Sequence, residues 1–101
     1  MRINFTDEAL ANLEDRLLFL IKVQKVPLDK VEEIRSNLFS RTKTLLDHPN
    51  LGQIEENFSH LKLNHRRLIE GSYKIIYRVD GDVIHVTDFF DTREHPSKMR
   101  S

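Results

Sequence analysis

The stretch YKIIYRVDGDVIHVTDFF, residues 73–90, decides the fold because it has the pattern of a β-hairpin. Two runs rich in β-branched and aromatic residues, 73–79 and 83–90, flank a short turn with the sequence DGD. Such residues favour strands, and a Gly-containing turn between two strand-like runs is a strong hairpin signal. The stretch therefore predicts two adjacent antiparallel strands.

Alternation along residues 73–79 divides the first of these strands into two faces. Side chains of successive strand residues point to opposite sides of a sheet. One side carries Tyr73, Ile75, Tyr77 and Val79, and the other carries Lys74, Ile76 and Arg78. We expect the first face to pack on helices and the second face to stay free for binding. Phe89 and Phe90 are expected to divide between the two faces in the same way.

Two further strands extend this sheet. Residues 61–69 precede the turn EGS at 70–72 and predict a third antiparallel strand. Near the N-terminus, residues 2–5 alternate polar and apolar side chains and predict a short strand that joins the others. Residues 50–59 are polar, and we expect them to form a loop.

Two amphipathic helices are predicted between the first strand and this loop. Thr6 resembles an N-cap, and an apolar stripe continues from there up to Lys25. Asp29 and Glu32 resemble a capping box that begins a second helix running toward Leu46. The stripes consist of Leu10, Leu13, Leu17, Leu20 and Ile21 in the first helix and Val31, Ile34, Leu38 and Leu45 in the second. The short link between the helices predicts an antiparallel helix hairpin.

These elements follow one another in the order β-α-α-β-β-β, which is an α+β fold. The N-terminal helix hairpin would cover one face of an antiparallel sheet. We expect residues 1–101 to form a single domain, because a chain of this length has room for one core. Residues 91–101 would form a polar C-terminal tail.

Composition excludes several classes of protein. The N-terminal residues lack the apolar run of a secretory signal, so we expect a cytoplasmic protein without a membrane segment. The chain has no cysteine and no Gly-rich phosphate loop, and His60 and His65 lack the spacing of metal ligands, so no metal and no cofactor are expected. Lys+Arg and Asp+Glu both number 16, and net charge therefore gives no general argument for a nucleic-acid partner.

Three segments of the chain resemble toxins of the RelE/ParE superfamily. They are RRLIEGSYKIIYRVDGDVIHV at 66–86, DTREHP at 91–96, and HPNLG at 48–52 after the second helix. The resemblance covers residues 5–99 and implies the fold predicted above. It also implies a toxin that arrests growth when free and is neutralised by a tightly bound cognate antitoxin in a hetero-oligomer.

Two activities occur in this superfamily. RelE-type toxins cut mRNA in the ribosomal A site, whereas ParE-type toxins bind DNA gyrase and perform no chemistry. For the RelE type, the resemblance implies that Lys74 and Arg93 are catalytic cations and that His95 is a substitute acid or base. It further implies cations that bind the target: Lys62, Arg66, Arg67 and Arg78. Alternatively, Lys74, Arg78 and Arg93 form a solvated face, and His95 is a solvated residue of the polar tail.

One position favours the ParE-type activity. RelE-type toxins carry a C-terminal tyrosine where this chain has Met99, which cannot transfer a proton. The predicted helices are also long, and near-zero net charge weakens the argument for an RNA-binding toxin. We therefore expect a gyrase-directed toxin, with a ribosome-dependent endoribonuclease, or a degenerate toxin that only binds its antitoxin, as the alternatives.

Overall fold

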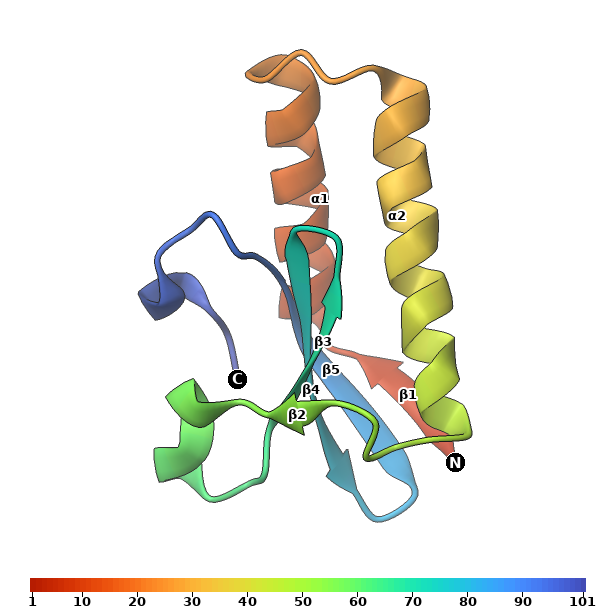
Figure 1. Ribbon diagram of the computed structural model, residues 1–101, viewed down its shortest axis with the longest axis vertical. Coiled ribbons are helices and arrows are strands. Elements are labelled where there is room, and N and C mark those ends of the chain that lie inside the picture. Colours follow the sequence, from red (N-terminus) through yellow and green to blue (C-terminus); the bar gives the residue numbers. More distant parts are fainter.

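The computed structural model describes residues 1–101 and has two helices beside one sheet (Figure 1). The strands are β1 (Arg2–Phe5), β2 (Gln53–Ile54), β3 (Arg66–Glu70), β4 (Tyr73–Asp80) and β5 (Val83–Asp91). The α-helices are α1 (Asp7–Lys22) and α2 (Leu28–Lys43), and the 3-10 helices are η1 (Thr44–Leu46), η2 (Glu56–Leu61) and η3 (Pro96–Lys98). The two α-helices form a hairpin whose connecting end extends beyond the sheet (Figure 1).

The sheet is mixed, which corrects the prediction of a wholly antiparallel sheet. Its strand order is β1-β5-β4-β3-β2, and the α+β fold class is confirmed. The pairs β2–β3, β3–β4 and β4–β5 are antiparallel, but β1 runs parallel to β5. Parallel neighbours cannot be joined by a tight turn and need a long connection, which the two helices and the strands β2 to β4 provide between β1 and β5. Strand β2 lies in the segment that was predicted as a loop.

The predicted beginning of α1 is confirmed, whereas the predicted beginning of α2 is wrong. The Thr6 hydroxyl accepts a hydrogen bond from the Ala9 amide over 3.1 Å, which caps the first helix. Helix α1 ends at Lys22, earlier than the predicted Lys25. In α2 the N-cap is Pro27, which has no side-chain acceptor, and Asp29 already lies in the first turn. The expected capping box is therefore absent.

The helices pack on the face of β4 that the alternation predicted. The main core contains residues of both α-helices, of η1 and of β3, β4 and β5: Ala9, Leu13, Leu17, Leu20, Val31, Leu38, Leu45, Leu68, Tyr73, Ile75, Tyr77, Ile84, Val86 and Phe89. Val79 packs partly buried against it. Burial of these side chains is the main favourable contribution to folding.

The other face of the sheet is partly covered, so the prediction of a free face is corrected. Ile76, Phe90 and Met99 form a second buried cluster, against which Phe58 packs. Met99 comes from the C-terminal segment, which was predicted as a polar tail. The division of Phe89 and Phe90 between the two faces is confirmed, because they belong to different clusters. A β-bulge between Ile76 and Tyr77 shifts the pairing of β4 with β5.

Strand β3 is shorter than predicted and begins at Arg66. The preceding residues belong to η2 and to a turn in which Lys62 and Asn64 have positive φ angles of 58° and 57°. Residues in this left-handed region cannot continue a strand. His60 lies on η2, and His65 is buried just before β3, so the two histidines do not share a strand.

Candidate functional site

Two of the predicted cations meet at one buried carboxylate. Lys74 Nζ lies 3.4 Å from Glu55 Oε2, and Arg67 Nη1 lies 3.5 Å from the same oxygen. The Glu55 side chain is 1% exposed, and the side-chain amide nitrogen of Asn57 donates to its Oε1 over 2.7 Å. Burial raises the pKa of Glu55, but the hydrogen bonds of Asn57 and the positive charges of Lys74 and Arg67 lower it by more. Glu55 is therefore ionised and pairs with both cations.

Two other predicted cations bind residues close to them in the fold, and a third lies outside the sheet. Arg66 Nη1 donates to the carbonyl oxygen of Gly52 over 2.7 Å, which fixes the segment before β2. Arg78 Nη1 lies 3.9 Å from an Asp80 carboxylate oxygen. Lys62 is at the C-cap of η2 and not on the strand where it was predicted.

Arg93 and His95 follow β5 and form local interactions. The Arg93 guanidinium donates to both carboxylate oxygens of Asp91, over 2.9 and 2.7 Å. Burial raises the pKa of Asp91, but the hydrogen bonds and charge of Arg93 outweigh this effect and the pKa is lowered. The exposed His95 ring accepts a hydrogen bond from the Ser97 amide over 3.1 Å and thereby caps η3.

The C-terminal segment is fastened to β5 around Met99, which is 4% exposed. The Arg100 amide donates to Asp88 Oδ2 over 3.0 Å, and the Thr87 hydroxyl donates to the Arg100 carbonyl oxygen over 3.1 Å. These bonds hold the Met99 side chain in the second cluster. The position at which a RelE-type toxin has its tyrosine is therefore an apolar anchor in this chain.

Arg16 of α1 binds the same end of β5. Its Nη1 donates to Asp88 over 2.6 Å and to the Phe89 carbonyl oxygen over 2.7 Å, and its Nε donates to Glu94 over 3.2 Å. The guanidinium also lies 5.5 Å from the centre of the Phe90 ring. The Asp88 side chain is fully buried, so this ion pair joins α1, β5 and the C-terminal segment.

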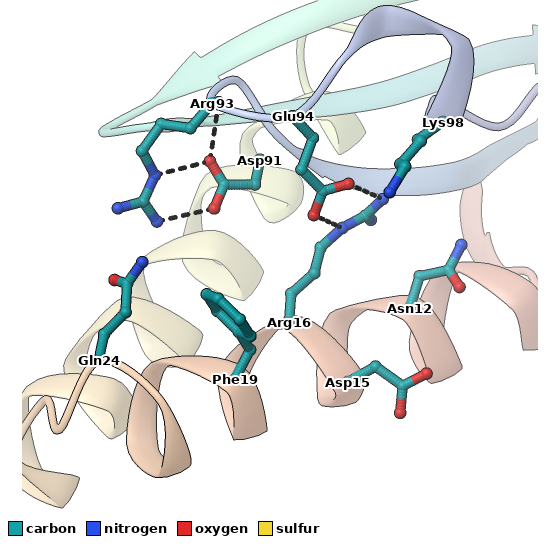
Figure 2. Close-up of a pocket in the computed structure, with 9 residues that line it drawn as sticks. All are labelled: Asn12, Asp15, Arg16, Phe19, Gln24, Asp91, Arg93, Glu94 and Lys98. Atoms are coloured by element: carbon teal, nitrogen blue, oxygen red, sulfur yellow. Dashed lines mark hydrogen bonds and ion pairs between the residues drawn. The ribbon is translucent and has the colours of Figure 1, made fainter.

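Two clefts lie beside this network. The first, of about 570 Å³, is shown in Figure 2 and is lined by Asn12, Asp15, Arg16, Phe19, Gln24, Asp91, Arg93, Glu94 and Lys98. The second, of about 360 Å³, is lined by Leu20, Gln24, Val26, Lys30, Ile34, Asn37, Leu38, Glu70, Gly71, Ser72, Tyr73 and Arg93. Gln24 and Arg93 line both clefts. Arg93 is thus a surface residue between two cavities, whereas Lys74 belongs to the cluster around Glu55.

Comparison with known proteins identifies the family. Residues 3–96 match the profile of the family described as ParE toxin of type II toxin-antitoxin system, parDE. The chain belongs to the ParE toxin family. The RelE/ParE resemblance found in the sequence is therefore confirmed, and the ParE branch is the one that matches.

A solved structure has the same fold as this ParE-family chain. It is described as the chromosomal ParDE TA system from P. aeruginosa, and it matches with a TM-score of 0.72 and 19% sequence identity. The match covers 90% of this chain and 95% of the other. A search of curated proteins finds no match. Neither α-helix has the length and apolar character needed to span a membrane.

Sequence reasoning missed the partners of the predicted cations in this ParE-family chain. Glu55 was part of an assumed loop, and its role depends on a two-residue strand that has no pattern of its own. Asp88 had a usable signal, because a carboxylate within the apolar run of β5 must find a cation when buried. Arg16 lies beside the apolar stripe of α1, where a long side chain can reach across to the sheet.

Proposed function

We propose that this ParE-family chain is the toxin of a toxin–antitoxin pair and arrests growth by binding DNA gyrase, without performing chemistry. The observation that carries the proposal is the pairing of the candidate catalytic cations with carboxylates of the same chain. Lys74 and Arg67 pair with buried Glu55, and Arg93 pairs with Asp91 in a bidentate arrangement. Met99, where a proton donor would be needed, is buried in an apolar cluster.

RNA cleavage without a metal requires a base, cations and an acid, and the ion pairs of Lys74 and Arg93 engage the cations that could take part. A base must take the 2′-hydroxyl proton, cations must stabilise the charge of the transition state, and an acid must protonate the leaving oxygen. His95 is the remaining titratable candidate, and its ring binds Ser97 at both the amide and the hydroxyl. Lys74, Arg93 and His95 therefore act in this proposal as structural or surface residues.

The end of the helix hairpin is proposed as the surface that contacts gyrase. It carries large apolar side chains that the fold leaves exposed: Leu18, Phe19, Val23 and Leu28, between 45% and 63% exposed. Exposed apolar groups that gather at one end of a molecule are typical of a protein-binding surface. The hairpin extends beyond the sheet, which leaves this end accessible (Figure 1).

The partner that neutralises the toxin is proposed to be a cognate antitoxin, as the family description and the name of the ParDE structure suggest. The two proteins would form a hetero-oligomer in the cytoplasm, where gyrase acts. An antitoxin that binds near the hairpin would compete with gyrase for the toxin. Binding of an antitoxin to the folded toxin would also stabilise it by mass action.

A supercoiling assay with purified gyrase tests the proposal. We expect the wild-type protein to inhibit supercoiling at stoichiometric amounts, and a Val23→Asp/Leu28→Asp variant to lose inhibition while remaining folded. Lys74→Met is the matched control, because it changes a cation on the opposite side of the sheet and should keep inhibition. Full supercoiling activity in the presence of folded wild-type toxin would contradict the proposal.

A translation extract tests the alternative activity. Cleavage of mRNA that requires Lys74 and Arg93 would favour the ribosome-dependent endoribonuclease. Normal growth on expression without an antitoxin, together with intact mRNA and active gyrase, would instead identify a degenerate toxin.

A further inference from the structure

Residues 55–65 form a compact surface loop, here called the flap, whose two ends are joined. The Glu55 amide donates to the His65 carbonyl oxygen over 2.8 Å, which closes the base of the flap. Between these ends lies η2, which stands near the C-terminal segment and away from both α-helices in Figure 1. Surface loops whose ends lie close together can open while the rest of the fold stays closed.

The side chain that attaches the flap to the sheet is Phe58. Its ring packs against the cluster of Ile76, Phe90 and Met99. The centre of this ring also lies 5.2 Å from the centre of the His65 ring. All other residues of η2 are exposed. The closed position of the flap therefore depends mainly on the packing of one aromatic ring.

The backbone at the end of the flap is strained. Lys62 and Asn64 have positive φ angles of 58° and 57°, where the chain turns from η2 toward β3. This left-handed region is unfavourable for residues that carry a Cβ atom, and asparagine tolerates it better than lysine does. Opening of the flap would release this strain.

The His65 ring at the base of the flap is buried, and neither of its nitrogens has a hydrogen-bond partner. His65 is 2% exposed, and its neighbours include the Phe58 ring and the positive charge of Arg78 on β4. A buried polar group without a partner costs stability. Burial and the charge of Arg78 both lower the pKa of His65, so the ring is neutral in the closed flap.

No carboxylate compensates a proton on the His65 ring. The Glu55 carboxylate is already paired with two cations, and Asp80, 3.9 Å from Arg78, is largely exposed. The remaining titratable groups of the flap are exposed: Glu56, His60 and Lys62. A protonated His65 in the closed flap would thus lie beside a cation and have no acceptor for its protons. Water can solvate the charge once the flap opens, so protonation and opening are linked.

We propose that the flap is a pH-sensitive cover of the far face of the sheet, and that protonation of His65 shifts it from a closed to an open state. In the open state Phe58 leaves the second apolar cluster. Because Glu55 lies at the base of the flap, opening also weakens its pairing with Lys74. This inference goes beyond the proposed function and does not depend on it, since it concerns the toxin by itself.

Hydrogen exchange measured by NMR at about pH 7.5 and about pH 5.5, on either side of the ordinary pKa of histidine, tests the inference. The reporters are three hydrogen-bonded amides of the flap: Glu55, Phe58 and Lys62. After correction for the intrinsic pH dependence of exchange, their protection factors should fall about five- to tenfold at the lower pH, because opening restores an ordinary histidine pKa. Unchanged protection factors would overturn the inference.

A low concentration of urea separates opening of the flap from unfolding of the whole domain. A local opening exposes little surface, so exchange of the flap amides should hardly respond to urea. Amides between β4 and β5 should be better protected and should respond strongly. Flap amides that exchange no faster than these would show that the flap does not open by itself, which would also overturn the inference.

The His65→Phe variant removes the titrating group and keeps an aromatic ring beside Phe58. We expect its flap amides to have the same protection factors at both pH values. His60→Asn is the matched control, because it removes an exposed histidine of the same flap, and it should keep the pH dependence of the wild type. A His65→Phe variant that keeps this dependence would refute the role of His65.

A direct titration of the His65 ring by NMR gives a second measurement, which does not require the His65→Phe variant to fold. Phe58→Ala removes the ring that holds the flap closed, so the pKa of His65 should rise toward its ordinary value. Leu61→Ala, at an exposed position of η2, is the matched control and should leave the pKa of His65 lowered. A lowered pKa in Phe58→Ala would mean that the flap does not bury His65, against the inference.

Discussion

Replacing Glu55 with glutamine tests the pairing of the candidate catalytic cations. The substitution keeps the shape of the side chain and its ability to accept from Asn57, but it removes the charge that binds Lys74 and Arg67. Both cations are 22% exposed, so each ion pair should contribute about 1 kcal/mol, at the upper end for surface pairs. We expect a loss of about 2 kcal/mol, which lowers the melting temperature by about 8–16 °C in a domain of this size.

Thermal and urea unfolding at neutral pH measure this loss. Glu56→Gln is the matched control, because the neighbouring carboxylate is exposed and should contribute little. A double-mutant cycle with Lys74→Met isolates the pair and should give a coupling of about 1 kcal/mol. The pH dependence gives an independent check. Because the pKa of Glu55 is lowered in the folded state, its stabilisation is present above the ordinary pKa of a glutamate and is lost as the pH falls through the folded pKa.

The result that would refute this reasoning is a small effect. If Glu55→Gln cost less than about 0.5 kcal/mol, as an ordinary surface substitution does, Glu55 would not hold the two cations. Lys74 would then be free to act on a substrate. The pairing of Lys74 with Glu55 could then no longer be used as evidence against RNA cleavage.

Three further perturbations follow from the packing. Gly52→Ala should cost about 3 kcal/mol in urea unfolding, because the added Cβ would lie 2.5 Å from the backbone carbonyl oxygen of Arg67. Gly71→Ala should cost about 1 kcal/mol, because Gly71 has a φ of +58° but open space around it. Equal losses in the two variants would contradict this prediction. Asp88→Asn should lower the free energy of unfolding by about 3 kcal/mol, because Arg16 loses its buried ionic partner. It should also speed proteolysis of the C-terminal segment, which mass spectrometry of the fragments measures. Burial and the nearby charge of Arg78 lower the pKa of His65, so the free energy of unfolding should fall as the pH drops below about 6.5. His65→Leu should make the free energy of unfolding less dependent on pH in this range. An unchanged pH dependence in the variant would mean that other groups cause it.

The elements with a strong local signal were predictable from the sequence. Thr6 followed by two acidic residues marked the beginning of α1, and the alternation from Tyr73 to Val79 correctly assigned the helix-facing side of β4. These signals depend only on neighbours in the chain. The same holds for the family resemblance, because its motifs are contiguous segments.

Features that depend on distant partners were not predictable. The parallel pairing of β1 with β5 depends on how the chain returns after both helices, and no residue of β1 encodes it. The cover on the second face depends on Met99 reaching Phe90 across a segment of polar residues. The candidate site was also only partly predictable, for the same reason. Lys74 was correctly placed on the far face, but its partner Glu55 lies 19 residues earlier in a segment without a clear pattern.

The position of β5 has a consequence for how the protein is made. This strand lies between β1 and β4, packs against α1 and leaves the ribosome after all three of these partners. Until it emerges, the apolar stripe of α1 and the edges of β1 and β4 have no partner, so the nascent chain cannot complete its core. Translation that stops before residue 83 would leave the cell with an unfolded fragment that proteases can remove. Only a chain translated through β5 assembles the surfaces proposed above.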